Sequence, residues 1–174
     1  MLLFAEIERK LRIAERLPGI IAAPRAPERV RHTLSEMIRY RALLIAAGYP
    51  DANDCDVLRD DPAVKMAVGR LPVTGAELCS QPTISGLENL PTKTTLTRMM
   101  DAMVDLLCDS FEKVPRCILL DIDDTLDRVH GRQQLSLFYA YHDSRCFLPI
   151  HVYEATSRKP GGGDPQTGQD AGRC

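Results

Sequence analysis

The chain has 174 residues, of which 44% are hydrophobic and 26% are charged. This composition excludes a chain that is disordered over most of its length, and no stretch approaches the roughly 20 consecutive apolar residues that a membrane-spanning helix requires. The formal net charge of -2 also excludes a uniformly basic surface for nucleic acid.

The distribution of charged residues and cysteines along the chain further limits the class of protein and its cellular compartment. Residues 1–50 contain nine Lys or Arg and five Glu, so this stretch nets +4 and the remainder of the chain nets -6. The six cysteines are far apart and form no C-x-x-C pair, which predicts reduced thiols and no zinc site. Glu6 and Glu8 interrupt the start of the chain before an apolar run long enough for a secretory signal can develop. We therefore predict a cytoplasmic protein.

Two helices are predicted in the first 50 residues. Residues 5–17 place apolar side chains close to helical spacing, and residues 20–30, which contain two prolines, are predicted to form a connector. Thr33 is a candidate N-cap, with Glu36 at the capping-box offset, for a helix that ends near Gly48. The predicted apolar face of this second helix consists of Leu34, Ile38, Leu43 or Leu44, and Ala47. Three arginines of this region are predicted to point outward: Arg31, Arg39 and Arg41.

Shorter helices are predicted next, followed by one long helix. Residues 51–68 predict two short helices, the second of them capped by Asp61 ahead of a proline. A loop over residues 69–82 and a short helical turn over 83–90 follow, and the strongest helical pattern begins after Pro91. Its apolar residues recur at steps of three and four, which predicts core packing. They are Leu96, Met99, Met100, Met103, Val104 and Leu107.

Beyond residue 115 the pattern becomes that of β-strands. Residues 116–127, RCILLDIDDTLD, form an apolar run that alternates into carboxylates, which is typical of a buried strand with a polar end. Residues 133–143 and 146–155 predict two further strands, joined by a tight turn at residues 143–144.

These elements predict an α+β fold in three parts. A helical N-terminal region covers residues 1–113, and antiparallel strands cover residues 114–160. The remaining residues, 161–174, have no apolar side chains to bury and are expected to be a disordered tail.

The most informative residues are the aspartates of the first strand. Side chains alternate along a strand, so Asp121 and Asp123 should project to the same side, about 7 Å apart along the backbone, while Ile122 enters the core. Two carboxylates this close repel each other unless a cation lies between them, and magnesium or manganese prefers such oxygen ligands. The alternative is a capped turn in which Asp124 and Thr125 bond backbone groups.

Two enzyme classes use a strand of this kind. Residues 119–126, LLDIDDTL, match the D-x-D-x-T-L motif of phosphatases with an aspartate nucleophile, in which Asp121 would be phosphorylated and Asp123 would act as acid and base. The same strand suits a two-metal nuclease or strand-transfer core of the ribonuclease-H type. A phosphatase needs a parallel sheet built from strand–helix–strand units, whereas two strands follow here almost directly, as in an antiparallel meander. The context favours the second class.

Four segments in series carry a more specific signal than any single motif. They are IERKLRIAERL, PRAPERVRHTLSEMIRYRALLIAAGYPDANDCDVLRDDPAVKMAVGRLP, SQPTISGLENLP and ILLDIDDTLDRVHGRQQLSLFYAYHDSRCFLPIHVYEATSRKP. In order and spacing, over roughly residues 4–160, they resemble the bacterial insertion-sequence transposases of the DDE-domain group 1 family.

The resemblance implies a ribonuclease-H-like core in which a first Asp, a second Asp and a Glu bind two divalent metals, magnesium or manganese, for phosphodiester hydrolysis and strand transfer. It places the first Asp in the cluster DIDDT: Asp123 is favoured, Asp121 is its support or alternative, and Asp124 ranks third. Asp121 and Asp123 are the expected metal ligands. The implied partners are the terminal inverted repeats of transposon DNA and full-length transposase, which implies association with the nucleoid.

Basic residues along the chain are candidates for contacts with DNA phosphates, although an ordinary solvated helix face is an equal alternative for the arginines. The candidates are Arg29, Arg31, Arg39, Arg41, Arg158 and Lys159.

The sequence also departs from the family pattern. Gly86 and Arg158 replace the usual residues, Tyr139 and His142 alter the usual hairpin, and after residue 160 the expected strand gives way to GGGDPQTGQDAGRC. We therefore expect a truncated or frameshifted N-terminal transposase fragment with an incomplete core, which lacks the second Asp and the Glu and is inactive alone. A regulatory fragment that binds DNA or transposase is the alternative.

Overall fold

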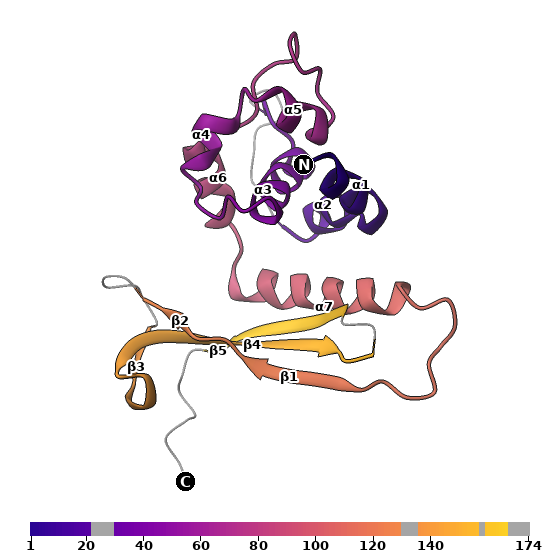
Figure 1. Ribbon diagram of the computed structural model, residues 1–174, viewed down its shortest axis with the longest axis vertical. Helices are drawn as coiled ribbons and strands as arrows, with labels where there is room; N and C mark the ends of the chain where they lie inside the picture. Colours follow the sequence, from indigo (N-terminus) through magenta and orange to yellow (C-terminus); the bar gives the residue numbers. More distant parts are fainter. Residues whose placement is uncertain (22–29, 130–135, 157–158, 167–174) are drawn as a thin grey trace. The chain divides into compact units, whose positions relative to one another are not determined.

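The computed structural model describes residues 1–21, 30–129, 136–156 and 159–166. The chain divides into two units, Met1–Met99 and Met100–Cys174, the first helical and the second containing an antiparallel sheet (Figure 1). This confirms the α+β class. Most of the predicted connector, residues 20–30, lies outside the described residues, and in the described part of the chain no helix is long and apolar enough to cross a membrane.

The helix predicted over residues 5–17 is divided in the structure. Helix α1 (Leu2–Leu11) and helix α2 (Ile13–Arg16) are separated by Arg12, whose φ of 57° is left-handed. A short 3₁₀ helix, η1, continues from α2 over Leu17–Gly19. The Glu8 carboxylate explains the break, because it accepts a hydrogen bond of 2.9 Å from the backbone N–H of Ala14 and so satisfies a donor in the first turn of α2.

Helix α3 (Leu34–Ala46) lies at the centre of the first unit and contacts α1 and α2 (Figure 1). Its cap is as predicted, since the Thr33 hydroxyl oxygen accepts a 3.1 Å hydrogen bond from the Glu36 N–H, and the chain leaves the helix through Gly48 at a φ of 91°. The buried face consists of Met37, Ile38, Tyr40, Leu43 and Leu44. Met37 and Tyr40, the largest fully buried side chains in the described residues, were missing from the predicted face.

Three shorter helices follow in the first unit: α4 (Asp54–Leu58), α5 (Pro62–Val68) and α6 (Gln81–Glu88). The predicted cap of α5 is confirmed, because one carboxylate oxygen of Asp61 accepts hydrogen bonds from two backbone N–H groups of the first turn, at 2.8 and 2.9 Å. Buried residues of these helices and of the segment before α6 pack into one core with α3, and they include Cys55, Val64, Ala67, Leu78, Cys79, Ile84 and Leu87. The cysteines of the described residues are free, as predicted, and burial raises the pKa of Cys79 to about 12.

Helix α7 (Lys93–Asp109) forms where the long helix was predicted, but its apolar stripe is less buried than expected. Leu107 is buried, whereas Leu96 and Val104 are exposed. Met99, Met100 and Met103 are partly buried. The predicted packing in a core is therefore wrong for Leu96 and Val104. The division between the two units falls within α7, between Met99 and Met100.

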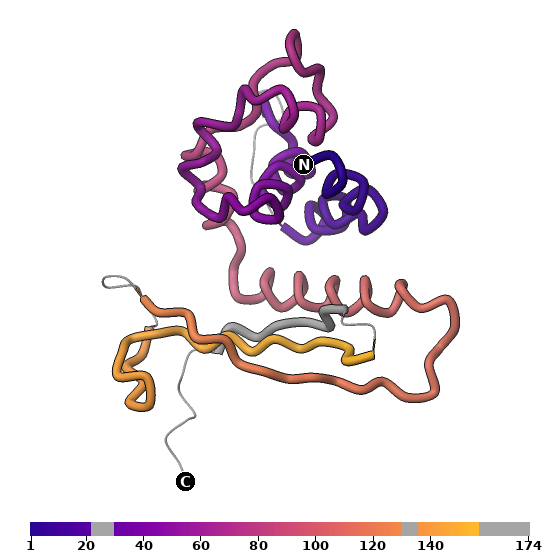
Figure 2. The backbone as a smooth tube through the Cα atoms, viewed as in Figure 1, coloured from indigo at the N-terminus to yellow at the C-terminus, as the bar shows by residue number. Residues whose placement is uncertain are grey.

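The sheet of the second unit is built around one long strand, β4 (Ser144–Glu154). Along one edge it pairs with β1 (Leu120–Asp124) and β2 (Asp127–Arg128), and along the other with β3 (Leu137–Tyr139) and β5 (Lys159–Gln166). Every pairing is antiparallel, and Figure 2 traces the backbone from β1 to β4 along the same path.

Strands β1 and β2 are in one register against β4. Leu120 lies opposite Glu154, and Arg128, at the other end, lies opposite Cys146. Between the two strands the N–H of Thr125 donates to the carbonyl of Pro149 at 3.0 Å, so the pairing register against β4 is the same for β1 and β2. The antiparallel arrangement predicted after the carboxylate motif is thereby confirmed.

The connections on the other edge are a tight hairpin and a longer strand than expected. A 3₁₀ turn, η3 (Ala140–His142), and Asp143, with a φ of 45°, join β3 to β4 near the predicted turn. Strand β5 continues to Gln166, although the sequence predicts a tail from residue 161. The pairing with β4 is made by backbone groups, which need no apolar side chains. Residues 167–174 of the predicted tail lie outside the described residues.

Candidate active site

The carboxylates of β1 are divided between the two faces of the sheet. Asp121 lies opposite Tyr153 on β4, and Asp123 lies opposite His151. Residues directly opposite in an antiparallel pair share a face, and neighbours along a strand alternate. Asp121, Asp123, His151 and Tyr153 therefore lie on one face, as predicted for the two aspartates, and Asp124 lies on the other.

The continuous register extends this polar face into β2. Thr125 and Asp127 are separated from Asp121 and Asp123 by even numbers of residues, so their side chains lie on the same face. Three carboxylates and a hydroxyl therefore follow one another along a single edge of the sheet. All residues of β1 and β2 are exposed. The carboxylates are therefore accessible from solvent to a ligand as large as a nucleic acid.

The prediction that this strand is buried is wrong. Ile122, expected in the core, is 63% exposed, and Leu120 beside it is exposed as well. All five residues of β1 are exposed, so among the described residues no packed layer covers either face of this strand, which pairs there with β4 alone. An apolar run of this length fits a buried central strand and an edge strand equally well, and only the pairing distinguishes them.

His151 is the residue that sequence reasoning missed. The sequence places no other histidine at metal-ligand spacing from His151, and so predicts an ordinary strand histidine. The register places it directly across from Asp123, and its ring lies 6.3 Å from that of Tyr153, centroid to centroid. Alternation along β4 could have shown that His151 and Tyr153 share a face, but nothing local shows which strand they accompany.

The donor types on this face suit a divalent metal, but they are too few to complete a site. Carboxylate oxygens are the ligands that magnesium prefers, and Asp121 and Asp123 supply them from one strand. Magnesium takes an octahedral set of ligands, whereas no three acidic, histidine or cysteine side chains within the described ranges converge to hold an ion. The two aspartates fit part of a coordination sphere.

Comparison with known proteins identifies the family behind this arrangement. A family model described as Transposase DDE domain group 1 matches residues 1–161, which is most of the chain. The chain belongs to this family. Comparisons with curated proteins and with solved structures gave no match. The match covers the helical unit and most of the sheet of the transposase chain, and transposases of this family generally use divalent metals.

Two of the arginines predicted to contact DNA are used inside the helical unit of the transposase. The Nε of Arg39 lies 2.6 Å from a carboxylate oxygen of Glu8, which is only 5% exposed. The Nε of Arg41 lies 2.6 Å from a carboxylate oxygen of Glu88. The prediction that these side chains point outward into solvent is wrong, because their partners are 31 and 47 residues away in the chain and only the fold brings them together.

The other predicted DNA contacts have different positions. Arg31 is exposed, as predicted. Arg29 and Arg158 lie outside the described residues, and Lys159 begins the backbone pairing of β5.

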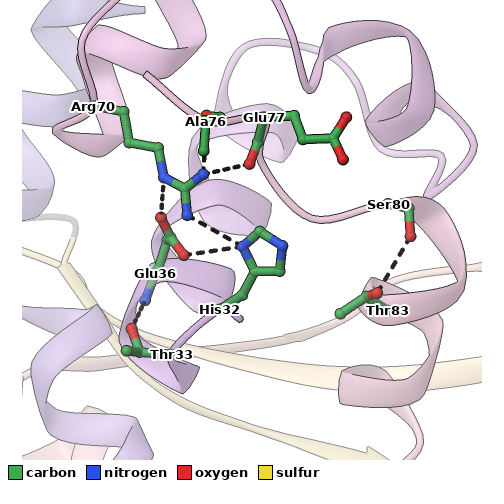
Figure 3. A network of polar contacts seen from close by, with 8 residues as sticks. All are labelled: His32, Thr33, Glu36, Arg70, Ala76, Glu77, Ser80 and Thr83. Carbon is green, nitrogen blue, oxygen red and sulfur yellow. Dashed lines mark hydrogen bonds and ion pairs between the residues drawn. The ribbon is translucent and has the colours of Figure 1, made fainter. Parts of the chain in front are cut away.

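A third arginine anchors the segment between α5 and α6 (Figure 3). The guanidinium of Arg70 donates to the carboxylate of Glu36 and, at 2.9 Å, to the carbonyl of Ala76. The Nδ1 of His32 lies 3.2 Å from Glu36 and 3.2 Å from Arg70, which closes the network. The N–H of Glu36 therefore donates to the Thr33 cap of α3, while its carboxylate connects the helix to a distant loop. The network is structural and lies in the first unit, away from the sheet carboxylates in the chain.

Proposed function

We propose that this chain carries the first catalytic aspartate of a DDE transposase, whose reaction is the metal-dependent hydrolysis of a DNA phosphodiester followed by strand transfer. The observation that supports the proposal is the pair of exposed carboxylates, Asp121 and Asp123, on one face of an antiparallel edge strand. We assign the catalytic role to Asp123, with Asp121 beside it as the second carboxylate. Asp124 stays third because it lies on the opposite face.

In this proposal Asp121 and Asp123 hold a magnesium or manganese ion. When bound, such an ion activates a nucleophile and stabilises charge on the phosphate. The protein contributes a fixed spacing, because β4 pairs with both aspartates and keeps them about 7 Å apart along the backbone. His151 and Tyr153 occupy the same face and bound the space in which a phosphate would approach.

We further propose that the chain does not cleave DNA alone. Family chemistry requires a second Asp and a Glu, and the residues described here bring no third ligand to Asp121 and Asp123. Cleavage of DNA would then require further carboxylates from outside the residues described here.

Metal binding tests the assignment. Asp123→Asn and Asp121→Asn are each expected to weaken Mn²⁺ binding, measured by the electron paramagnetic resonance signal of the free ion, by at least about tenfold, because each removes a ligand. Asp105→Asn, at an exposed position on α7, is the matched control and should leave the affinity unchanged. Equal affinity in all three variants would refute the assignment, and metal-dependent nicking of transposon-end DNA by the purified chain would refute its inactivity.

For the DNA contacts we retain Arg29, Arg31, Arg158 and Lys159 as proposed phosphate ligands. Arg39 and Arg41 become poorer candidates. Each already neutralises a carboxylate at 2.6 Å, so binding a phosphate would require breaking that ion pair.

A regulatory fragment that binds full-length transposase is a second candidate function. Leu120 and Ile122 are exposed apolar residues on an edge strand, and such an edge can pair with another chain. Co-purification with the full-length enzyme is expected for the unmodified chain and should be lost in Ile122→Lys, because charge on an edge strand opposes pairing. Retention by Ile122→Lys would remove this candidate.

A further inference from the structure

The hairpin between β3 and β4 presents a group of aromatic rings that the carboxylate site does not use. The ring of Tyr139 stacks on that of His142, with centroids 5.4 Å apart and an angle of 29° between the planes. Tyr141 contacts the same histidine edge-on, at 4.9 Å and 84°. Tyr141 is 87% exposed, so the outermost ring of the group faces solvent. We refer to Tyr139, Tyr141 and His142 as the ring group.

The backbone holds this group at a defined place on the sheet. Tyr139 pairs with Ser144, and the N–H of Asp143 donates to the carbonyl of Ala140 at 3.2 Å, which closes the turn. A tyrosine side chain has only two rotatable angles, so a flat ligand that stacks on it costs little conformational entropy. An anchored and exposed ring is therefore well suited to bind a planar partner.

Two exposed arginines lie on strands beside the same hairpin. Arg145 follows the turn on β4, and one of its guanidinium nitrogens donates to the carbonyl of Ser136 at 2.9 Å. Arg128 lies on β2, opposite Cys146. Among the residues that the structure describes, neither guanidinium forms an ion pair with a carboxylate, in contrast to Arg39 and Arg41. Alternation along β4 places Arg128 on the face of Tyr139 and Arg145 on the opposite face, so of these two arginines it is Arg128 whose charge is available to an anion beside the ring group.

We propose that the ring group is a stacking platform for an unpaired base of DNA, with Arg128, which lies on the same face of the sheet as Tyr139, contacting a neighbouring phosphate. The inference rests on the proposed function in taking DNA as the ligand. A ring at the tip of a hairpin can reach the flat face of a base only when that base has left the duplex stack. Every base has such a face, so the platform should tolerate different sequences and prefer single strands.

The chain contains no tryptophan, which allows a direct optical test. In the full chain carrying Tyr141→Trp, a single-stranded oligonucleotide of mixed sequence is expected to quench the tryptophan emission. The blunt duplex of the same sequence should quench it with an apparent affinity about tenfold weaker, because its bases are stacked on each other. Tyr49→Trp, at an exposed position of the first unit, is the control and should show no quenching.

Affinity provides the second measurement. Tyr141→Ala should weaken single-strand binding, followed by fluorescence anisotropy of a labelled oligonucleotide, about tenfold, whereas Tyr141→Phe should retain it because stacking needs the ring and not the hydroxyl. Tyr49→Ala is the matched control, and circular dichroism should show an unchanged fold for all variants. Binding without quenching, an unaffected Tyr141→Ala variant, or no binding to single strands would each overturn the inference. A different outcome is that the single strand quenches Tyr141→Trp while Asp123→Asn leaves the Mn²⁺ affinity unchanged. That outcome would overturn the proposed function and leave the platform in place.

Discussion

Replacing Arg39 with alanine should destabilise the helical unit by about 3 kcal/mol, because it leaves a buried carboxylate without its counter-ion. Glu8 is 5% exposed, and its two oxygens are used by Arg39 at 2.6 Å and by the N–H of Ala14 at 2.9 Å. Without the guanidinium the remaining backbone hydrogen bond cannot offset the desolvation of the charge. The measurement is urea unfolding of the full chain followed by far-ultraviolet circular dichroism, which reports mainly on the helices.

The chain offers a matched control for this ion pair. Arg9 and Glu6 lie 2.7 Å apart on α1, but both side chains are more than half exposed. Arg9→Ala should therefore change the free energy of unfolding by no more than about 0.5 kcal/mol. If the two arginine variants lose equal stability, the special role of the buried Glu8 carboxylate is wrong.

Tyr40→Ala is expected to cost about 4 kcal/mol of unfolding free energy, the largest effect in the first unit. The side chain is fully buried, and its hydroxyl donates a 2.9 Å hydrogen bond to the carbonyl of Cys55. Removing the ring leaves a cavity between α3 and α4 and an unsatisfied carbonyl. The same burial raises the pKa of Tyr40, which keeps the hydroxyl protonated as a donor.

Tyr40→Phe separates the two contributions. It keeps the ring and removes the hydrogen bond, so urea unfolding should show a loss of about 1–2 kcal/mol. Tyr49→Ala, at an exposed position, should lose less than about 1 kcal/mol. A Tyr40→Phe variant as unstable as Tyr40→Ala would mean that the hydrogen bond, and not the packing of the ring, dominates.

Local signals predicted the parts of the fold that depend on neighbouring residues. Thr33 and Asp61 cap their helices as expected, since an N-cap bond joins residues two or three positions apart. The family resemblance, carried by ordered segments, is confirmed by the match over residues 1–161. Helical periodicity located α3, but it missed Met37 and Tyr40, because a face approached from several directions is wider than a single stripe.

The candidate site was predictable in part. Alternation along a strand placed Asp121 and Asp123 on one face whatever the partner strand. It could not show that Ile122 is exposed or that His151 lies opposite Asp123, because edge position and register are properties of pairs of strands.

The sequence by itself determined the α+β order of elements, the helix caps and the shared side of the two aspartates, all of which follow from backbone geometry over a few residues. Only the tertiary structure decided that Glu8 becomes the buried partner of Arg39 and that the carboxylate strand lies at a sheet edge. The physical reason is that burial, ion pairing and strand register depend on contacts between segments far apart in the chain. A local sequence pattern limits the interactions that a residue can form, but it does not identify the residues that it contacts.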